Sequence, residues 1–299
     1  MRVYEWWYMT EPLIITRTGA KAMLAKYGLG ANKKLGQHYL VDTHVLDKIL
    51  AVAELSPECA VLEIGPGLGA LTQALAGKAG HVCAVEIDMQ LAEALSDFFA
   101  NTPNVRIYQG DILKTNLNDI LLPYKGSNIK AVANLPYYIS SPAIFKLLES
   151  EIKFTSITVM VQKEVAGRMA AKPNNKDYGA LTLAINYHAD IYLAANVPPN
   201  CFMPRPNVDS AIVHLTPYYK PPVKADKDLL FYLIKKAFGQ RRKTLVNALS
   251  AAGNIPYVYS FTKGQITAAI NKTGLLENVR GEMLSLHDFS NLAELLAQM

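Results

Sequence analysis

The sequence predicts an α/β domain built on a mostly parallel sheet and followed by a small all-helical domain. In the middle of the chain, short apolar runs rich in β-branched residues alternate with segments of helical periodicity, which is the pattern of βαβ units. After residue 220 only amphipathic helical patterns occur. The length agrees, because 299 residues correspond to two domains of ~150 residues.

The apolar runs place the elements of the first domain. Strands are expected at Ala60–Ile64, His81–Ile87, Val105–Tyr108, Ile129–Ala133 and Ser156–Val161. Helices are expected between them at Ala70–Ala76, Met89–Ala100, Pro142–Leu148 and Glu164–Ala170. Two last runs, Ile191–Val197 and Ser210–Leu215, flank a proline-rich loop and predict an antiparallel hairpin at the sheet edge, so the domain should end near Pro217.

The segment 218–222 (YYKPP) is typical of a linker. Beyond it, helices are expected around Leu230–Phe238 and at Leu245–Ala252, Lys263–Asn271 and Asp288–Gln298. The predicted organisation is therefore an N-terminal arm (1–32), an α/β domain (33–219) and a helical domain (220–299).

The composition excludes several classes of protein. An apolar fraction of 51% with 18% charged residues can form a buried core, which excludes a disordered chain. No apolar stretch reaches the ~18 residues of a transmembrane helix, and Glu5 and Glu11 lie where a signal peptide needs apolar residues. The three cysteines are far apart and form no metal-binding spacing. We therefore expect a cytoplasmic protein without disulfides, membrane contact or a protein-bound metal.

The charge is unevenly distributed along the chain. Residues 1–50 hold 7 basic and 4 acidic residues, residues 51–219 hold 12 and 15, and residues 220–299 hold 11 and 6. Two basic ends around an acidic centre are typical of a protein that binds a polyanion at its flanks, although solvated surface gives the same pattern.

A glycine-rich turn joins the first expected strand to its helix. Gly65, Gly67 and Gly69 let the backbone approach a ligand closely, and the helix N-terminus offers free N–H groups. Glu86 ends the next strand, where an acidic residue accepts hydrogen bonds from ribose hydroxyls. This order of elements predicts a nucleotide-like cofactor; the alternative is a turn selected for tight packing.

The identity of this cofactor depends on Glu63, two residues before the first glycine. A carboxylate there would repel the pyrophosphate of a dinucleotide, whereas it suits the cationic amino or sulfonium group of S-adenosylmethionine. Asp111 follows the third strand and is expected either to bind an adenine amino group or to cap a helix.

The segment Asn134-Leu135-Pro136-Tyr137 follows the fourth strand and is the most specific motif. The Asn134 side-chain oxygen and the Leu135 carbonyl can bind the two hydrogens of an adenine N6 amine, so that its lone pair faces a methyl donor. Pro136 fixes the turn, and Tyr137 can stack on the base. Such a transfer needs no metal and no strong base, because positioning supplies most of the rate. An ordinary turn with a core tyrosine is the alternative.

These motifs resemble the ribosomal RNA adenine N6-dimethyltransferases, specifically the bacterial small-subunit type. The resemblance extends from Lys33 to the C-terminus and depends on the segments KKLGQHYLVD (33–42), LEIGPGLGALT (62–72), VEID (85–88), GD (110–111), NLPYYISSP (134–142), MVQKEVAGRM (160–169), YGAL (178–181), VPPNCFMPRPNVDSAIV (197–213) and FGQRRKTL (238–245). It implies a Rossmann-like class I methyltransferase sheet over 33–219 and a helical RNA- or ribosome-binding domain over 220–299.

The resemblance also assigns the site. S-adenosylmethionine would contact His38, Leu40, Gly65, Glu86, Asp111 and Asn134. The target base would lie among Asn134, Leu135, Pro136 and Tyr137, with Phe202 stacked on its other face; a core anchor for its loop is the alternative role of Phe202. His38 departs from the family, which usually reads QNFL where this chain has QHYL, so its contact with the donor is the least defined.

A basic cluster begins at the end of the first helix of the helical domain. It consists of two arginines and three lysines: Lys235, Lys236, Arg241, Arg242 and Lys243. Such a cluster predicts a phosphate-binding face, and a face that is only solvated is the alternative. Lys33 and Lys34 would extend it.

The resemblance implies dimethylation of N6 on two adjacent adenosines in a hairpin near the 3′ end of small-subunit rRNA, by a monomer acting on an immature 30S-type subunit. Three alternatives stay open. The first is a resistance-type methyltransferase of large-subunit rRNA, which tends to carry NIPY and to lack the long 197–213 segment. The second is an assembly factor whose binding matters more than its catalysis, and the third is methylation of DNA adenine.

Overall fold

The computed structural model describes residues 13–32, 35–250 and 261–299. The chain divides into two compact units, the first made of residues up to Ala166 together with Tyr192–Pro217, the second of Gly167–Ile191 and Tyr218–Met299. Within the described ranges, no helix is both long and apolar enough to cross a membrane.

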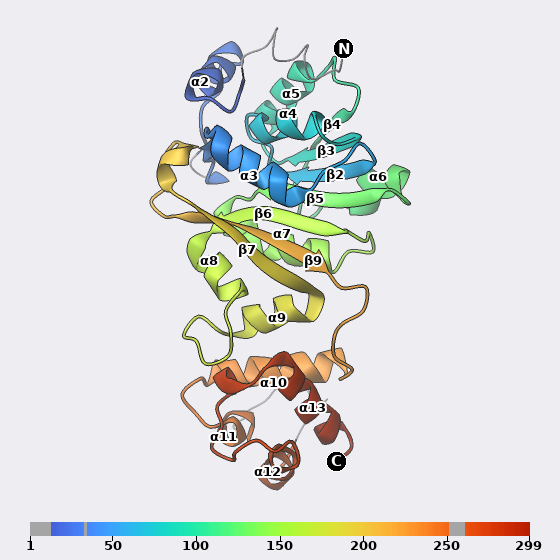
Figure 1. Ribbon diagram of the computed structural model, residues 1–299, viewed down its shortest axis with the longest axis vertical. Helices are drawn as coiled ribbons and strands as arrows, with labels where there is room; N and C mark the ends of the chain where they lie inside the picture. Colours follow the sequence, from blue (N-terminus) through green and yellow to red (C-terminus); the bar gives the residue numbers. More distant parts are fainter. Residues whose placement is uncertain (1–12, 33–34, 251–260) are drawn as a thin grey trace. The chain divides into compact units, whose positions relative to one another are not determined.

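The first unit is built on a seven-stranded sheet of order β4-β3-β2-β5-β6-β9-β7 (Figure 1). The five strands from β4 to β6 in this order are parallel, and β9 is antiparallel to β6. Their bounds are β2 Cys59–Ile64, β3 His81–Glu86, β4 Val105–Gln109, β5 Asn128–Asn134, β6 Ser156–Gln162, β7 Ala189–Val197 and β9 Ser210–Pro217. The predicted parallel sheet and its antiparallel edge are therefore confirmed.

The burial of the strands agrees with their places in the sheet. All six residues of β2 and six of the seven residues of β6 are buried, as expected for central strands of a sheet covered by helices. The chain reverses its direction of winding between β2 and β5, and such a switch point opens a crevice at the carboxyl ends of the strands. The helices of this unit are α2 Arg17–Lys26, α3 Thr43–Ala53, α4 Ala70–Ala76, α5 Met89–Phe98, α6 Leu117–Leu121 and α7 Ser140–Leu148, with short 3₁₀ turns at Leu122–Tyr124, Tyr137–Ile139 and Pro199–Cys201.

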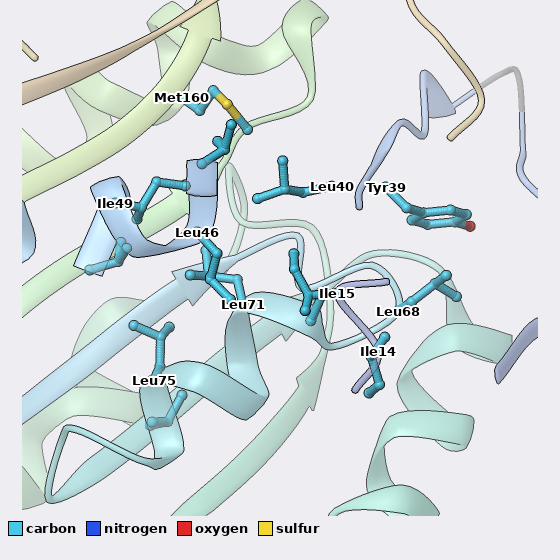
Figure 2. Close-up of a cluster of buried hydrophobic side chains, with 14 of the residues drawn as sticks. Ile14, Ile15, Tyr39, Leu40, Leu46, Ile49, Leu68, Leu71, Leu75 and Met160 are labelled. Carbon is cyan, nitrogen blue, oxygen red and sulfur yellow. The ribbon is translucent and has the colours of Figure 1, made fainter. Parts of the chain in front are cut away.

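A small second sheet fixes the segment before α3. β1 (Tyr39–Leu40) pairs antiparallel with β8 (Phe202–Met203), with Leu40 opposite Phe202. The described part of the predicted N-terminal arm also belongs to this unit, because Ile14 and Ile15 are 1% and 3% exposed and lie in the same apolar cluster as α3 and α4 (Figure 2). Residues 13–32 therefore contribute to the core.

The second unit is helical, with α9 Ala180–His188, α10 Lys227–Gly239, α11 Leu245–Ser250, α12 Lys263–Lys272 and α13 Leu286–Ala297, and a 3₁₀ turn at Gly281–Met283. The chain passes between the units within α8 (Lys163–Met169), within β7 and after Pro217. Residues 167–191, which the sequence placed in the α/β domain, belong here because Tyr178, Leu183 and Tyr187 are buried in the helical core. The last two residues of the helix predicted at Leu245–Ala252 lie outside the described residues.

Candidate active site

A cleft with a cavity volume of about 190 Å³ lies at the carboxyl ends of β2, β3 and β5. It brings together every residue expected to contact the cofactor: His38, Leu40, Gly65, Glu86, Asp111 and Asn134. The rest of the expected amine clamp, Leu135, Pro136 and Tyr137, lines the same cleft. His38 and Tyr137, 99 positions apart in the sequence, thus meet at the switch point of the sheet.

The glycine-rich turn provides the floor of the cleft. Gly65 and Gly67 have φ values of +66° and +58°, a conformation that glycine adopts without strain. A Cβ atom on Gly67 would lie 3.0 Å from Cδ1 of Tyr39, so a side chain there would force the Tyr39 ring to shift. The turn therefore requires glycine for its conformation and for the space beside it.

Glu63 is the most unusual group in the cleft. Its side chain is 1% exposed, and Oε2 has no hydrogen-bond partner among the described residues. Burial raises the pKa of Glu63 to about 8, and the nearby Glu86 carboxylate adds to the rise. A buried carboxyl that lines a ligand cleft and has one oxygen without a hydrogen-bond partner fits a cationic ligand, which would stabilise its ionised form. This feature matches the amino or sulfonium group of S-adenosylmethionine.

Glu86 is held in a fixed orientation at the end of β3. Oε1 accepts a hydrogen bond from the Asp88 N–H at 2.9 Å, and Oε2 accepts one from the Gly67 N–H at 3.2 Å. Burial raises the pKa of Glu86, while these two donors oppose the rise. Each carboxylate oxygen keeps a further lone pair, which suits it to accept from the two hydroxyls of a ribose.

Asn134 ends β5 with its side-chain amide already oriented. Nδ2 donates to the His38 carbonyl at 3.2 Å, which leaves Oδ1 as an acceptor in the cleft. The Leu135 N–H donates to the Met160 carbonyl at 3.1 Å and continues the β5–β6 pairing through the motif. The orientation of the acceptor expected for an amine hydrogen, Asn134 Oδ1, is therefore determined by the end of β5 and by the backbone of the QHYL segment.

The aromatic wall of the clamp consists of Tyr137 and His38. Their rings lie 5.9 Å apart between centroids, and the Tyr137 hydroxyl is hydrogen-bonded to Ser210 Oγ at 2.7 Å. Burial raises the pKa of Tyr137, so this hydroxyl stays neutral. His38 Nδ1 donates to the Pro204 carbonyl at 2.8 Å, which leaves only Nε2 available to a ligand.

Phe202 is not part of the cleft. Its side chain is 1% exposed, lies in the apolar core cluster and is on β8, paired with Leu40. A ring buried to this extent offers no face to a base, so the stacking role expected for Phe202 is wrong for this conformation. The alternative role, a core anchor for its loop, agrees with the structure.

Two supporting residues escaped the sequence analysis. Gln37 Nε2 donates to Asp88 Oδ2 at 3.3 Å, and its Oε1 accepts from the Tyr39 hydroxyl at 2.8 Å. Asp88 in turn caps the N-terminus of α5. A signal existed for each: Gln37 lies inside the QHYL motif, and Asp88 precedes a helix at a capping position.

The basic cluster lies in the helical unit. Lys235, Arg242 and Lys243 are exposed, and Lys236 Nζ lies 5.8 Å from the ring centre of Tyr232. Arg241 differs from them, because its guanidinium is already hydrogen-bonded within the protein. Lys33 and Lys34 lie outside the described residues.

The comparison with protein families decides the identity of this fold and cleft. A family model described as ribosomal RNA adenine dimethylase matches residues 28–298. The chain belongs to this family. The predicted fold class, enzyme class and S-adenosylmethionine cofactor are confirmed with it.

Individual proteins are similar to this chain over most of its length. Ribosomal RNA small subunit methyltransferase A of Lachnoclostridium phytofermentans is 50% identical over 277 residues, which are 92% of this chain and 94% of that protein. A crystal structure of a dimethyladenosine transferase from Plasmodium falciparum has a TM-score of 0.72 at 29% identity, covering 85% of this chain and 96% of that one. The 23S rRNA methyltransferase ErmE has a TM-score of 0.66 at 25% identity, covering 87% and 100%.

Proposed function

We propose that this dimethylase transfers methyl groups to N6 of two adjacent adenosines in a hairpin near the 3′ end of small-subunit rRNA. The observation that carries the proposal is the Asn134 amide, whose Oδ1 is left as an acceptor in the cleft that also holds Glu63 and Glu86. The choice of the small subunit is supported by the Lachnoclostridium relative, which is 50% identical and carries that substrate in its name.

When bound, S-adenosylmethionine supplies an electrophilic methyl group on a sulfonium centre. Glu86 would hold the ribose hydroxyls, Asp111 would hold the adenine amine, and Glu63 would stabilise the cationic part of the molecule. All three carboxylates line one cleft, so one donor molecule could be held by all of them.

The amine of the target adenosine needs activation, because its lone pair is delocalised into the ring. Asn134 Oδ1 and the Leu135 carbonyl accept its two hydrogens and direct the lone pair toward the methyl group, while Tyr137 stacks on the base. The proton then leaves to water. Positioning of this kind accounts for most of the rate in reactions that need no strong base.

The base must leave its stack to reach this cleft, so the RNA has to be held elsewhere as well. We assign this role to the exposed cations of the helical unit, Lys235, Arg242 and Lys243, with Lys236 beside them. The substrate is expected to be an immature 30S-type subunit in the cytoplasm, bound by one copy of the chain.

The test is mass spectrometry of rRNA after incubation of the purified protein with labelled S-adenosylmethionine and immature small subunits from a strain that lacks its own enzyme. Two neighbouring N6,N6-dimethyladenosines near the 3′ end are expected. Transfer to large-subunit rRNA instead would assign the chain to the resistance type. Tight subunit binding without any transfer would favour an assembly factor.

A further inference from the structure

The Arg241 guanidinium is bound to the loop between α8 and α9. Nη1 donates to the Lys176 carbonyl at 2.6 Å and Nη2 donates to the Asn175 carbonyl at 3.0 Å, while Nε donates to Glu282 Oε2 at 2.6 Å. Three of the five N–H groups of an arginine are therefore used inside the protein. Its charge is also paired, because Glu282 lies within salt-bridge distance.

The same loop, residues 172–177, is attached to the segment around Glu282 by further bonds. The Asn174 N–H donates to the Glu282 carbonyl at 2.9 Å, and the hydroxyl of Tyr178, which is 1% exposed, donates to the Leu284 carbonyl at 2.7 Å. Together with the Arg241 bonds, these contacts attach the loop and the residue that follows it to the segment around Glu282 at several points.

Two of these exposed side chains are lysines. Lys172 and Lys176 are both exposed, and within the described ranges neither ammonium group has a carboxylate at salt-bridge distance. Arg242 and Lys243 follow Arg241 directly and are exposed as well. Because Arg241 donates to the backbone of the loop, the four exposed cations lie on two adjoining segments, where the exposed Asp177 is the loop's one carboxylate; we call this set of cations the loop surface: Lys172, Lys176, Arg242 and Lys243.

We propose that Lys172 and Lys176 bind phosphates of the RNA substrate as part of the loop surface, and that Arg241 is a positioning residue that holds this surface together. The partner is an RNA backbone, because the surface offers four cations and a polyanion is the substrate of the family. The inference deepens the proposed function and depends on it: it adds two phosphate contacts and removes Arg241 from the direct contacts.

The first test is the salt dependence of binding between the full-length protein and immature small subunits. Each phosphate contact contributes roughly 0.9 to the slope of log K against log salt concentration for a duplex. The K172Q/K176Q variant should therefore have a slope smaller by about 2. The matched control is K263Q/K272Q, which removes two exposed lysines of α12 in the same unit and should keep the wild-type slope. An unchanged slope in K172Q/K176Q, or an equal loss in the control, overturns the proposal.

The second test separates positioning from direct contact at Arg241. Arg241→Lys keeps the positive charge but loses the planar fork, so it should reduce the slope, with little further effect in the K172Q/K176Q background. Glu282→Gln removes the negative charge that is paired with Arg241 and leaves every cation of the loop surface in the sequence. Simple electrostatics predicts tighter RNA binding in this variant, whereas loss of positioning predicts weaker binding. A wild-type slope in Arg241→Lys, or tighter binding in Glu282→Gln, overturns the positioning role.

Thermal unfolding and donor binding, measured on each variant, show that the fold is retained. Methylation of the small subunit by the wild-type protein tests the proposed function separately. The wild type can methylate the subunit while the loop variants keep the wild-type salt slope of binding. In that case only the inference about the loop surface fails. If the wild type neither binds nor methylates the subunit, the proposed function fails and this inference fails with it.

Discussion

Binding of the methyl donor is expected to release a proton from Glu63. In the protein without donor, burial raises the pKa of the Glu63 carboxyl to about 8. Because pH 7 is one unit below this pKa, the carboxyl is about nine-tenths protonated there. A cationic group placed beside it favours the carboxylate and lowers this pKa. Close to one proton should therefore leave for each donor molecule bound at pH 7.

Isothermal titration calorimetry measures this number directly. The apparent binding enthalpy at pH 7 is compared in phosphate and Tris buffers, whose ionisation enthalpies differ, and the difference gives the protons released. Glu63→Gln should abolish the release and weaken donor binding. Glu93→Gln, which removes an exposed carboxylate on α5, is the control and should behave as wild type. Equal enthalpies in the two buffers for the wild type, or an undiminished release in Glu63→Gln, would refute the role given to Glu63.

The same group makes the stability of the free protein depend on pH. Between pH 4.5, the ordinary pKa of the side chain, and pH 8, the unfolded chain loses this proton while the folded chain keeps it. The unfolded state then binds fewer protons, so the contribution of Glu63 to stability falls as the pH rises through this window and is constant above it. At pH 7 the penalty is on the order of 3 kcal/mol, from 1.36 kcal/mol per pH unit. Denaturant unfolding at several pH values should show this component in the wild type and not in Glu63→Gln.

The other predictions concern the clamp, the ribose site and the core. Asn134→Ala should lower the single-turnover rate by roughly 10²-fold or more, as for other groups that position transition-state charge, and leave the donor Kd nearly unchanged; a weaker Kd at an unchanged rate would contradict the clamp. Glu86→Ala should raise the donor Kd by roughly 10-fold or more, from charged hydrogen bonds of ~1.5–3 kcal/mol, and calorimetry showing equal affinity would remove Glu86 from the site. Phe202→Ala should lower the free energy of unfolding by ~3–5 kcal/mol, whereas Phe202→Leu should keep methyl transfer; a large loss of kcat in a stable Phe202→Leu would restore its stacking role.

The sequence predicted the parts of this protein that depend on neighbouring residues. The strands and the glycine turn follow from local patterns, and parallel strands necessarily bring Glu63, Glu86 and Asn134 to one edge of the sheet. The place of the cleft therefore follows from the sequence alone. The small β1–β8 sheet could not, because two residues on each side leave no periodicity to detect.

The division into domains was harder for the same reason. Residues 167–191 follow a strand and precede another, so along the chain they resemble one more βα unit. Their partners are far away in sequence: Tyr178 bonds to Leu284, and Leu183 and Tyr187 lie in the helical core. A pattern read within a short window cannot reveal which distant surface an apolar face will cover.

Arg241 and Phe202 show that residue type alone leaves the role of a side chain open. Each was expected to touch RNA, the first because arginine binds phosphate and the second because aromatic rings stack on bases. Burial removes Phe202 from the surface, and three internal hydrogen bonds occupy Arg241. In both cases the partners, which for Arg241 are two backbone carbonyls and the Glu282 carboxylate and for Phe202 are core residues, are distant in sequence and meet these side chains only in the folded chain. The positions of Glu63 and Asn134 did follow from the sequence, because these residues lie within the last two positions of their strands and line the cleft.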